Sequence, residues 1–127
     1  MRDFKNLIVW KKSHKNALLI YELTKSFPKE ELYGLISQLR RASVSIPTNI
    51  AEGCGKFTQK DFANFLQISL GSSHEVEYLI LLSYELKYFD QTNYNNLNEA
   101  INEVKAMLIA LIKKLRYNDF KLLALNF

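Results

Sequence analysis

The chain has 127 residues, an apolar content of 48% and a net charge of +4, which predict one globular domain over residues 1–127. Four glycines and two prolines leave little material for hairpin turns, so the composition favours long helices. A single cysteine excludes an intramolecular disulfide, and no apolar run approaches the length of a membrane span. We therefore expect a soluble, cytoplasmic protein without a membrane partner.

Two helices are predicted in the first half of the chain. Apolar residues at helical spacing mark a first helix over about residues 5–26, with an apolar stripe broad enough for burial on two sides. It ends at Phe27, because the residue before Pro28 is pushed out of the α region. A second helix follows over about residues 31–52 and is closed by the two glycines after it.

Pro47 lies inside the second predicted helix. It removes one backbone donor and crowds the carbonyl of Ser43, so we expect a kink near Pro47. Ser43 and Ser45 are near enough to help satisfy the freed backbone groups. Two helices broken at Ile46 are the alternative. The apolar and polar stripes keep their phase through the proline, which favours one kinked helix.

Two further helices complete the chain. Thr58 has the side chain of an N-cap, with an acidic residue three positions later, and starts a third helix that continues to about Phe89. From Val76 onward this helix is apolar nearly all round, which exceeds what a small monomer buries and indicates a protein–protein interface. A fourth helix spans about residues 93–116. The apolar tail, residues 120–127, either extends this helix or folds back onto a neighbour.

Four amphipathic helices with short connections predict an all-α fold, an up-down-up-down antiparallel four-helix bundle. This topology brings eleven basic and four acidic residues to one end, with a charge of about +7 against about −3 for the rest of the chain. A concentrated positive charge of this kind is typical of a surface that binds the phosphate backbone of a nucleic acid. The alternative is that lysines at helix ends only keep the bundle soluble and interact favourably with the helix dipole. The candidate nucleic-acid-binding residues are Lys11, Lys12, Lys15, Lys56, Lys60, Lys113, Lys114 and Arg116; Arg2, Lys5 and Lys121 complete the basic set.

A polar stripe runs beside the apolar face of the second predicted helix. With one carboxylate of the third helix it forms a predicted structural network of Gln38, Arg40, Arg41, Ser45, Asn49, Glu52 and Glu75. Glu75 falls among apolar positions, so we expect it to be partly buried and paired with an arginine of the second helix. Two carboxylates could perform acid–base chemistry. A network that fixes helix register or a subunit interface is the favoured interpretation.

Three other patterns do not support a catalytic or metal site. Residues 53–58, GCGKFT, resemble a phosphate-binding loop, but Ile50 stands where the first glycine belongs and a helix precedes it. His14 and His74 lie on different helices, and neither has a second ligand at metal-binding spacing. Cys54 has no evident base beside it, which favours a role in turn packing. We expect no catalytic residue, no metal ligand and no cofactor.

The run RRAxxSIPxNIAEG at residues 40–53 is specific enough to indicate a family. Further matching residues are Leu7, Val9-Trp10-Lys11, Tyr21, Phe27-Pro28, Glu31, Tyr33-Gly34-Leu35, Gln38-Leu39, Phe65-Leu66, Gly71-Ser72, Glu75 and Met107-Leu108. With these residues nearly the whole chain resembles the four-helix bundle proteins encoded in intervening sequences of bacterial 23S ribosomal RNA genes. That family is related to the accessory bundle protein of diversity-generating retroelements. Departures are minor: Cys54 stands where an aromatic residue is usual, and Lys56 where an arginine is common.

This resemblance implies a subunit that assembles into a ring-like homopentamer and has no known catalytic activity. Nucleic-acid binding, with RNA favoured, is implied by analogy with the retroelement relatives, as is a reverse-transcriptase-like partner. We therefore favour a non-enzymatic homo-oligomer that binds RNA through the basic end of the bundle. A structural or protein-adaptor bundle without a nucleic-acid ligand is the alternative. An enzyme that uses Glu52 or Glu75 is a distant third.

Overall fold

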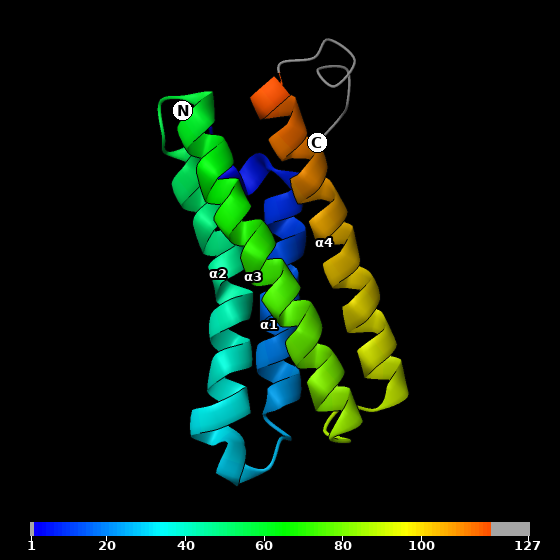
Figure 1. Ribbon diagram of the computed structural model, residues 1–127. Coiled ribbons are helices and arrows are strands. Elements are labelled where there is room, and N and C mark those ends of the chain that lie inside the picture. The colour runs from blue at the N-terminus through cyan, green and yellow to red at the C-terminus, as the bar shows by residue number, and fades with distance from the viewer. Residues whose placement is uncertain (1, 118–127) are drawn as a thin grey trace.

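The computed structural model describes residues 2–117, which form four long helices with short connections (Figure 1). The helices are α1 (Ile8–Thr24), α2 (Ser37–Cys54), α3 (Gln59–Glu85) and α4 (Gln91–Tyr117). A 3-10 turn at Phe4–Asn6 precedes α1, and two single-turn segments at Lys29–Glu31 and Leu32–Ile36 lead into α2. No strand occurs in residues 2–117, and the predicted all-α fold is confirmed. The tail at residues 120–127 lies outside the described residues.

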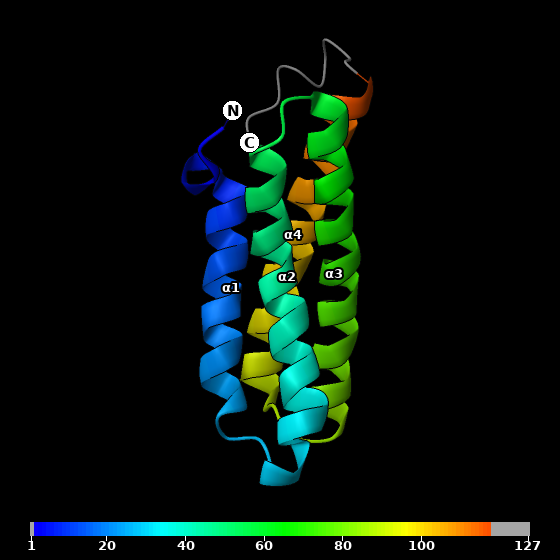
Figure 2. The ribbon, with the colours of Figure 1, turned by 90° about the vertical axis from the view of Figure 1, so that its left-hand side faces the viewer.

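The helices alternate in direction around a shared core (Figures 1 and 2). α2 packs against α1 and α3, and α4 packs against α3 and α1. The N-terminal ends of α1 and α3 lie at the same end of the bundle as the C-terminal ends of α2 and α4. This arrangement is the predicted up-down-up-down topology.

The core consists of apolar side chains from all four helices. The most completely buried include Ile20, Leu39, Ile50, Phe62, Leu66, Leu79, Ile80, Ile101, Val104 and Leu108. Their removal from water is the main force that stabilises the bundle, because most of the stability of helices in proteins comes from packing of an apolar face. The contact between α2 and α3 is the most extensive, whereas α1 contacts its neighbours less.

The second helix begins later than the sequence predicts. A 3-10 turn at Lys29–Glu31 and a π turn at Leu32–Ile36 occupy its expected first turns, and α2 starts at Ser37. Within the π turn, Gly34 has φ −111° and ψ −109°, far from helical values. Apolar spacing continues through this turn, which is why the interruption is not visible in the sequence pattern.

α2 continues through Pro47, so the alternative of two helices broken at Ile46 is wrong. Two side chains donate to the carbonyls of the two residues before the proline. Asn49 Nδ2 donates to the Ser45 carbonyl at 2.8 Å, and the buried Ser69 Oγ of α3 donates to the Ile46 carbonyl at 2.8 Å. The first bond lies within α2, and the second ties the region around the proline to α3. The kink near Pro47 stays a prediction.

The two serines expected to serve the backbone near Pro47 form other hydrogen bonds. Ser43 Oγ donates to the Arg40 carbonyl at 2.9 Å, and Ser45 Oγ lies 2.9 Å from Ser72 Oγ on α3. Neither hydroxyl bonds the carbonyl that the proline leaves without its helical donor, so that prediction is wrong. A hydroxyl in the middle of a helix can reach a neighbouring helix as well as its own backbone, and sequence spacing does not distinguish the two.

The predicted start of the third helix is confirmed, and its end is earlier than predicted. Thr58 Oγ1 accepts from the Asp61 backbone N–H at 3.1 Å, as an N-cap does. α3 ends at Glu85 because Lys87 adopts a left-handed conformation, with φ 67°, which a continuing α-helix does not contain. Phe89 is nevertheless buried in the core, so the apolar pattern extends beyond the helix.

Candidate functional site

The basic pole is the end of the bundle where α1 and α3 begin and α2 and α4 end (Figure 2). The basic residues assigned to it that the structure describes are Arg2, Lys5, Lys11, Lys12, Lys15, Lys56, Lys60, Lys113, Lys114 and Arg116. The acidic residues assigned to it are Asp3, Glu52 and Asp61, which leaves a net charge of about +7. Lys121 and Asp119, which were also assigned to this pole, lie outside the described residues.

Several of these cations are engaged by neighbouring side chains. Lys12 Nζ lies 2.6 Å from Glu103 Oε1 on α4, and Arg116 donates to an amide oxygen on α3 at 3.1 Å. Lys56 Nζ lies 4.9 Å from the ring centroid of Phe65. Glu103 was not assigned to the pole from the sequence, and its inclusion lowers the net charge to about +6.

Four lysines of the basic pole are exposed and have no side-chain partner among the described residues. They are Lys11, Lys15, Lys60 and Lys113, from α1, α3 and α4. A hydrated ammonium group without a counter-charge is available to a phosphate oxygen. These four side chains are therefore the part of the pole most accessible to a polyanion.

Arg40, predicted as part of the polar network on α2, turns toward α1. Its Nε donates to Thr24 Oγ1 at 2.9 Å, and its Nη2 donates to the Tyr21 carbonyl at 3.3 Å. Both acceptors lie in the last turns of α1, where backbone carbonyls lack helical donors and a positive charge suits the helix dipole. Arg40 therefore links α2 to the end of α1.

Arg41 and Glu75 line one polar recess between α2 and α3, of about 400 Å³, without forming an ion pair. Arg41 Nη2 donates to Ser37 Oγ at 3.3 Å, and Glu75 Oε2 accepts from Gln38 Nε2 at 3.4 Å. Glu75 is exposed, so its predicted burial and arginine pairing are wrong. α3 places Glu75 at the solvent edge of the contact with α2, beside the core positions rather than among them.

The remaining members of the predicted network lie on different faces of α2. Ser45 contacts Ser72 of α3 and accepts from Asn49 Nδ2 at 3.1 Å. Glu52 is exposed and lines the groove between α1 and α2 beside Trp10. The polar stripe therefore does not reach Glu52 as one connected set. A role for the set in helix register or in a subunit interface stays a prediction.

Cys54 is buried in the core, and His14 lies against an aromatic ring. Burial raises the pKa of the Cys54 thiol, against a smaller opposing effect of Arg2, so the thiol stays protonated at neutral pH. His14 stacks on Trp10 with ring centroids 4.9 Å apart. In residues 2–117 no cluster of His, Cys, Asp and Glu side chains is arranged to hold a metal ion.

An ion pair between α3 and α4 was not anticipated from the sequence. Lys105 Nζ donates to Glu77 Oε1 at 2.8 Å, and the two side chains are 15% and 34% exposed. The hydrogen bond from Lys105 is the main cause that lowers the pKa of Glu77. The partners lie on different helices, 28 residues apart, so only the packing of α3 on α4 reveals the pair.

We expect Glu77 to make stability pH-dependent in the acid range. Its pKa is lower in the folded chain than in the unfolded chain. Its stabilising contribution is therefore complete above the ordinary pKa of about 4.3 and is lost as pH falls through the folded value. In urea denaturation between about pH 3 and pH 7, Glu77→Gln should lose less unfolding free energy on acidification than the wild type. Glu99→Gln, an exposed control on α4, should keep the wild-type profile, and identical profiles for all three proteins would contradict the assignment.

Comparison with known proteins identifies the family of this chain. The family model for the 23S rRNA-intervening sequence protein matches residues 5–110, most of the chain. The chain belongs to this family. The resemblance stated from the sequence is thereby confirmed.

A solved structure from the S23 ribosomal protein family shares the architecture. It is a protein of unknown function from Bacteroides thetaiotaomicron, 28% identical, with a TM-score of 0.77, and the match covers 84% of this chain and 96% of that one. No curated protein sequence matches the chain. None of the helices in residues 2–117 combines the length and hydrophobicity that a membrane span requires.

Proposed function

We propose that this member of the 23S rRNA-intervening sequence protein family is a non-catalytic, cytoplasmic homopentamer that binds RNA through its basic pole. The observation that carries the proposal is the surplus of positive charge there, with Lys11, Lys15, Lys60 and Lys113 exposed and unpaired within residues 2–117. The phosphate backbone of a nucleic acid is the polyanion that such a surface attracts. Family analogy alone suggests a reverse-transcriptase-like partner.

Assembly would bring several basic poles together. Exposed apolar side chains on α3 support an interface between copies, among them Ile68 at 51% and Tyr78 at 59% exposure. In a ring with all poles on one side, five copies of the pole would face a single RNA. Repeated weak contacts of this kind raise the overall affinity without any new contact.

Native mass measurement tests the assembly. Five chains of 14.8 kDa give about 74 kDa, and we expect this mass at micromolar concentration. Ile68→Asp combined with Tyr78→Asp should lower the mass, because two carboxylates would be placed in a contact that excludes water. Leu18→Asp with Leu19→Asp, equally apolar exposed positions on α1, should leave the mass unchanged. A wild-type mass of one chain would contradict the assembly.

A structural or protein-adaptor bundle is the second candidate, and a groove between α1 and α2 favours it. The groove has a volume of about 470 Å³, and its lining is mainly apolar, with Trp10, Leu18 and Val44 exposed in part. This candidate predicts that a protein partner co-purifies and that no RNA is retained at physiological salt. Glu52 and Glu75 are exposed on different faces of the bundle, so we assign no acid–base pair to them.

A further inference from the structure

The α1–α2 groove is the hollow of about 470 Å³ between α1 and α2, two helices that lie side by side in Figure 2. It begins at the basic pole, where its lining includes Phe4, Trp10 and Glu52, and it extends along both helices to Tyr21 and Val44. Trp10 and Tyr21 are eleven residues apart on α1. At a rise of about 1.5 Å per residue, the groove is about 16 Å long.

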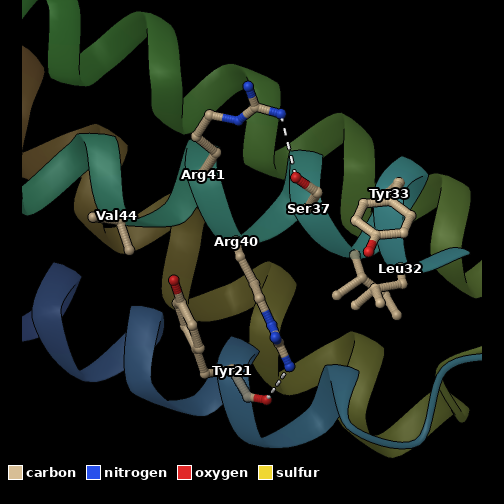
Figure 3. Close-up of a pocket in the computed structure, with 8 residues that line it drawn as sticks. Tyr21, Leu32, Tyr33, Ser37, Arg40, Arg41 and Val44 are labelled. Atoms are coloured by element: carbon tan, nitrogen blue, oxygen red, sulfur yellow. Dashed lines mark hydrogen bonds between the residues drawn. The ribbon is translucent and has the colours of Figure 1, made fainter. Parts of the chain in front are cut away.

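Arg40 crosses from α2 to α1 at the far end of the groove (Figure 3). Its Nη2 donates to the Tyr21 carbonyl at 3.3 Å, and its guanidinium carbon lies 4.7 Å from the Tyr21 ring centroid. Val44 lies on the same side of α2 as Arg40, whereas Arg41 points away from α1. A side chain fixed to α1 therefore marks one end of the groove, and the basic pole is the other end.

Within residues 2–117 nothing covers the apolar lining of the groove. Leu18, Tyr21 and Val44 are 60%, 43% and 39% exposed and follow one another along the two helices. Neighbouring exposed apolar side chains of this kind mark a surface that binds another apolar surface. Glu52 is exposed at the pole end of the groove and has no ion pair among the described residues. The occupant that fits is an apolar segment with a positive charge beside it.

The tail, residues 120–127, has this composition. Its sequence is FKLLALNF, in which six of eight residues are apolar and Lys121 is the one charged residue. Alternate residues of an extended chain share one side, so Leu123, Leu125 and Phe127 would form one apolar side. Residues 122–127 span at most about 16–18 Å when extended, which matches the length of the groove.

The end of α4 is close enough for the tail to reach the groove. Tyr117 ends α4 at the basic pole, and α4 packs against α1, which packs against α2. Axes of adjacent packed helices lie about 8–10 Å apart, so the groove is within about two such spacings of the end of α4. Residues 118–121 bridge at most about 16–18 Å between Tyr117 and the next residue of the tail.

We propose that the tail docks in the α1–α2 groove of its own chain, with Leu123, Leu125 and Phe127 facing the groove. Lys121 then lies beside Glu52 at the pole end. The tail is tethered next to the groove, and a short tether gives an effective concentration on the order of millimolar. A weak apolar contact is therefore sufficient within one chain, whereas a second copy or a protein partner must bind from solution.

Docking of the tail bears on the adaptor candidate, because the tail and a protein partner would compete for the same groove. It does not rest on RNA binding at the basic pole. The exposed side chains of α3 that support the contact between copies, Ile68 and Tyr78, are not part of the groove. The tail, the basic pole and the contact between copies can therefore be tested separately.

Fluorescence of Trp10, the single tryptophan of the chain, tests the proposal. A docked tail covers the indole where it lines the groove. Compared with a chain shortened to end at Tyr117, the full chain should emit at shorter wavelength and be quenched less by acrylamide. Leu18→Asp should give the full chain the emission of the shortened chain, because it places a carboxylate in the apolar contact. Leu123→Asp with Leu125→Asp should do the same from the side of the tail.

Matched variants separate docking from the substitution itself. Leu19→Asp is the same change at the next residue of α1, which is exposed but does not line the groove, and it should keep wild-type emission. Asn126→Asp adds a charge to the other side of an extended tail and should also keep it. Leu18→Asp in the shortened chain should cause no further change. Leu18 is exposed, so its replacement does not threaten the core.

Trypsin gives a second measurement, because Lys121 is the one tryptic site in the tail. A protease cleaves the open form, so the cleavage rate follows the fraction of chains with an undocked tail. Burial of one leucine shifts such an equilibrium about tenfold or more. Cleavage after Lys121, followed by mass spectrometry, should therefore be about tenfold faster or more in Leu18→Asp, and unchanged in Leu19→Asp.

Three results would overturn the proposal. The first is identical Trp10 emission and quenching in the full and shortened chains. The second is an equal response of Leu18→Asp and Leu19→Asp in both measurements. The third is a lower native mass of the shortened chain, since the tail would then bind a second copy. If Leu18→Asp leaves emission unchanged but releases a co-purified protein, the groove belongs to a partner and the proposal is wrong.

Discussion

Replacement of Lys11, Lys60 and Lys113 together by glutamate should weaken binding of a structured RNA by about 100-fold or more near physiological salt. The three side chains are exposed on three helices of the basic pole, and none has a partner within residues 2–117. Their reversal removes three phosphate contacts per chain and adds repulsion. In anisotropy titrations at several salt concentrations, the slope of log K against log salt should also fall by about 2 to 3.

The control is an equal change of charge at the other end of the bundle. Lys25, Lys29 and Lys87 are exposed there, and their replacement by glutamate alters the net charge by the same amount. Lys25 forms a surface pair with Glu22, whose loss costs little. We expect this variant to bind RNA within a few-fold of the wild type. Retained binding in the first variant would exclude the pole as the site, and equal losses in both would indicate only non-specific attraction.

Gly53→Ala should destabilise the fold by about 1–2 kcal/mol, because α3 packs closely against α2 at this glycine. A Cβ at Gly53 would lie 2.8 Å from Phe62 Cδ1 and 3.0 Å from Phe65 Cβ, both on α3. Overpacking of this kind costs about 1–3 kcal/mol, and the better helix propensity of alanine offsets up to about 1 kcal/mol of it. The free energy of unfolding from guanidinium denaturation measures the difference.

Gly71→Ala is the matched control, because it is the same change in the middle of α3. A Cβ at Gly71 would meet nothing within 4 Å in one chain, so we expect a gain of about 0.5–1 kcal/mol in unfolding free energy. A lower native mass for Gly71→Ala would place this position in the contact between copies. Wild-type stability in Gly53→Ala would contradict the close packing of α2 on α3.

The topology was predictable because the chain carries clear signals at its helix boundaries. Thr58 caps α3 as expected, whereas α1 ends at Thr24, three residues before the end predicted at Phe27-Pro28. The errors lie where backbone geometry changes without a change in apolar spacing. Gly34 interrupts the path into α2, and the left-handed Lys87 ends α3 before the last buried aromatic residue. Both are local backbone conformations, which a pattern of apolar residues does not encode.

Much of the candidate site follows from the order of the helices, because topology decides which ends meet. The lysines of the basic pole could be grouped in this way, whereas cross-helix partners could not. Glu103 reduces the charge of the pole, Lys105 pairs with Glu77, and Ser69 bonds a carbonyl of α2. The relative rotation of packed helices decides these contacts. The same rotation leaves Glu75 at the solvent edge, where the sequence placed it among apolar neighbours.

Lysine footprinting of the wild-type protein, with and without a structured RNA, tests the central claim most directly. Acetylation rates of individual lysines are measured by mass spectrometry at equal protein concentration. We expect RNA to protect Lys11, Lys15, Lys60 and Lys113, and to leave Lys25, Lys29 and Lys87 unchanged. Uniform protection, protection confined to the second set, or no protection at an RNA concentration that saturates binding would contradict RNA binding through the basic pole.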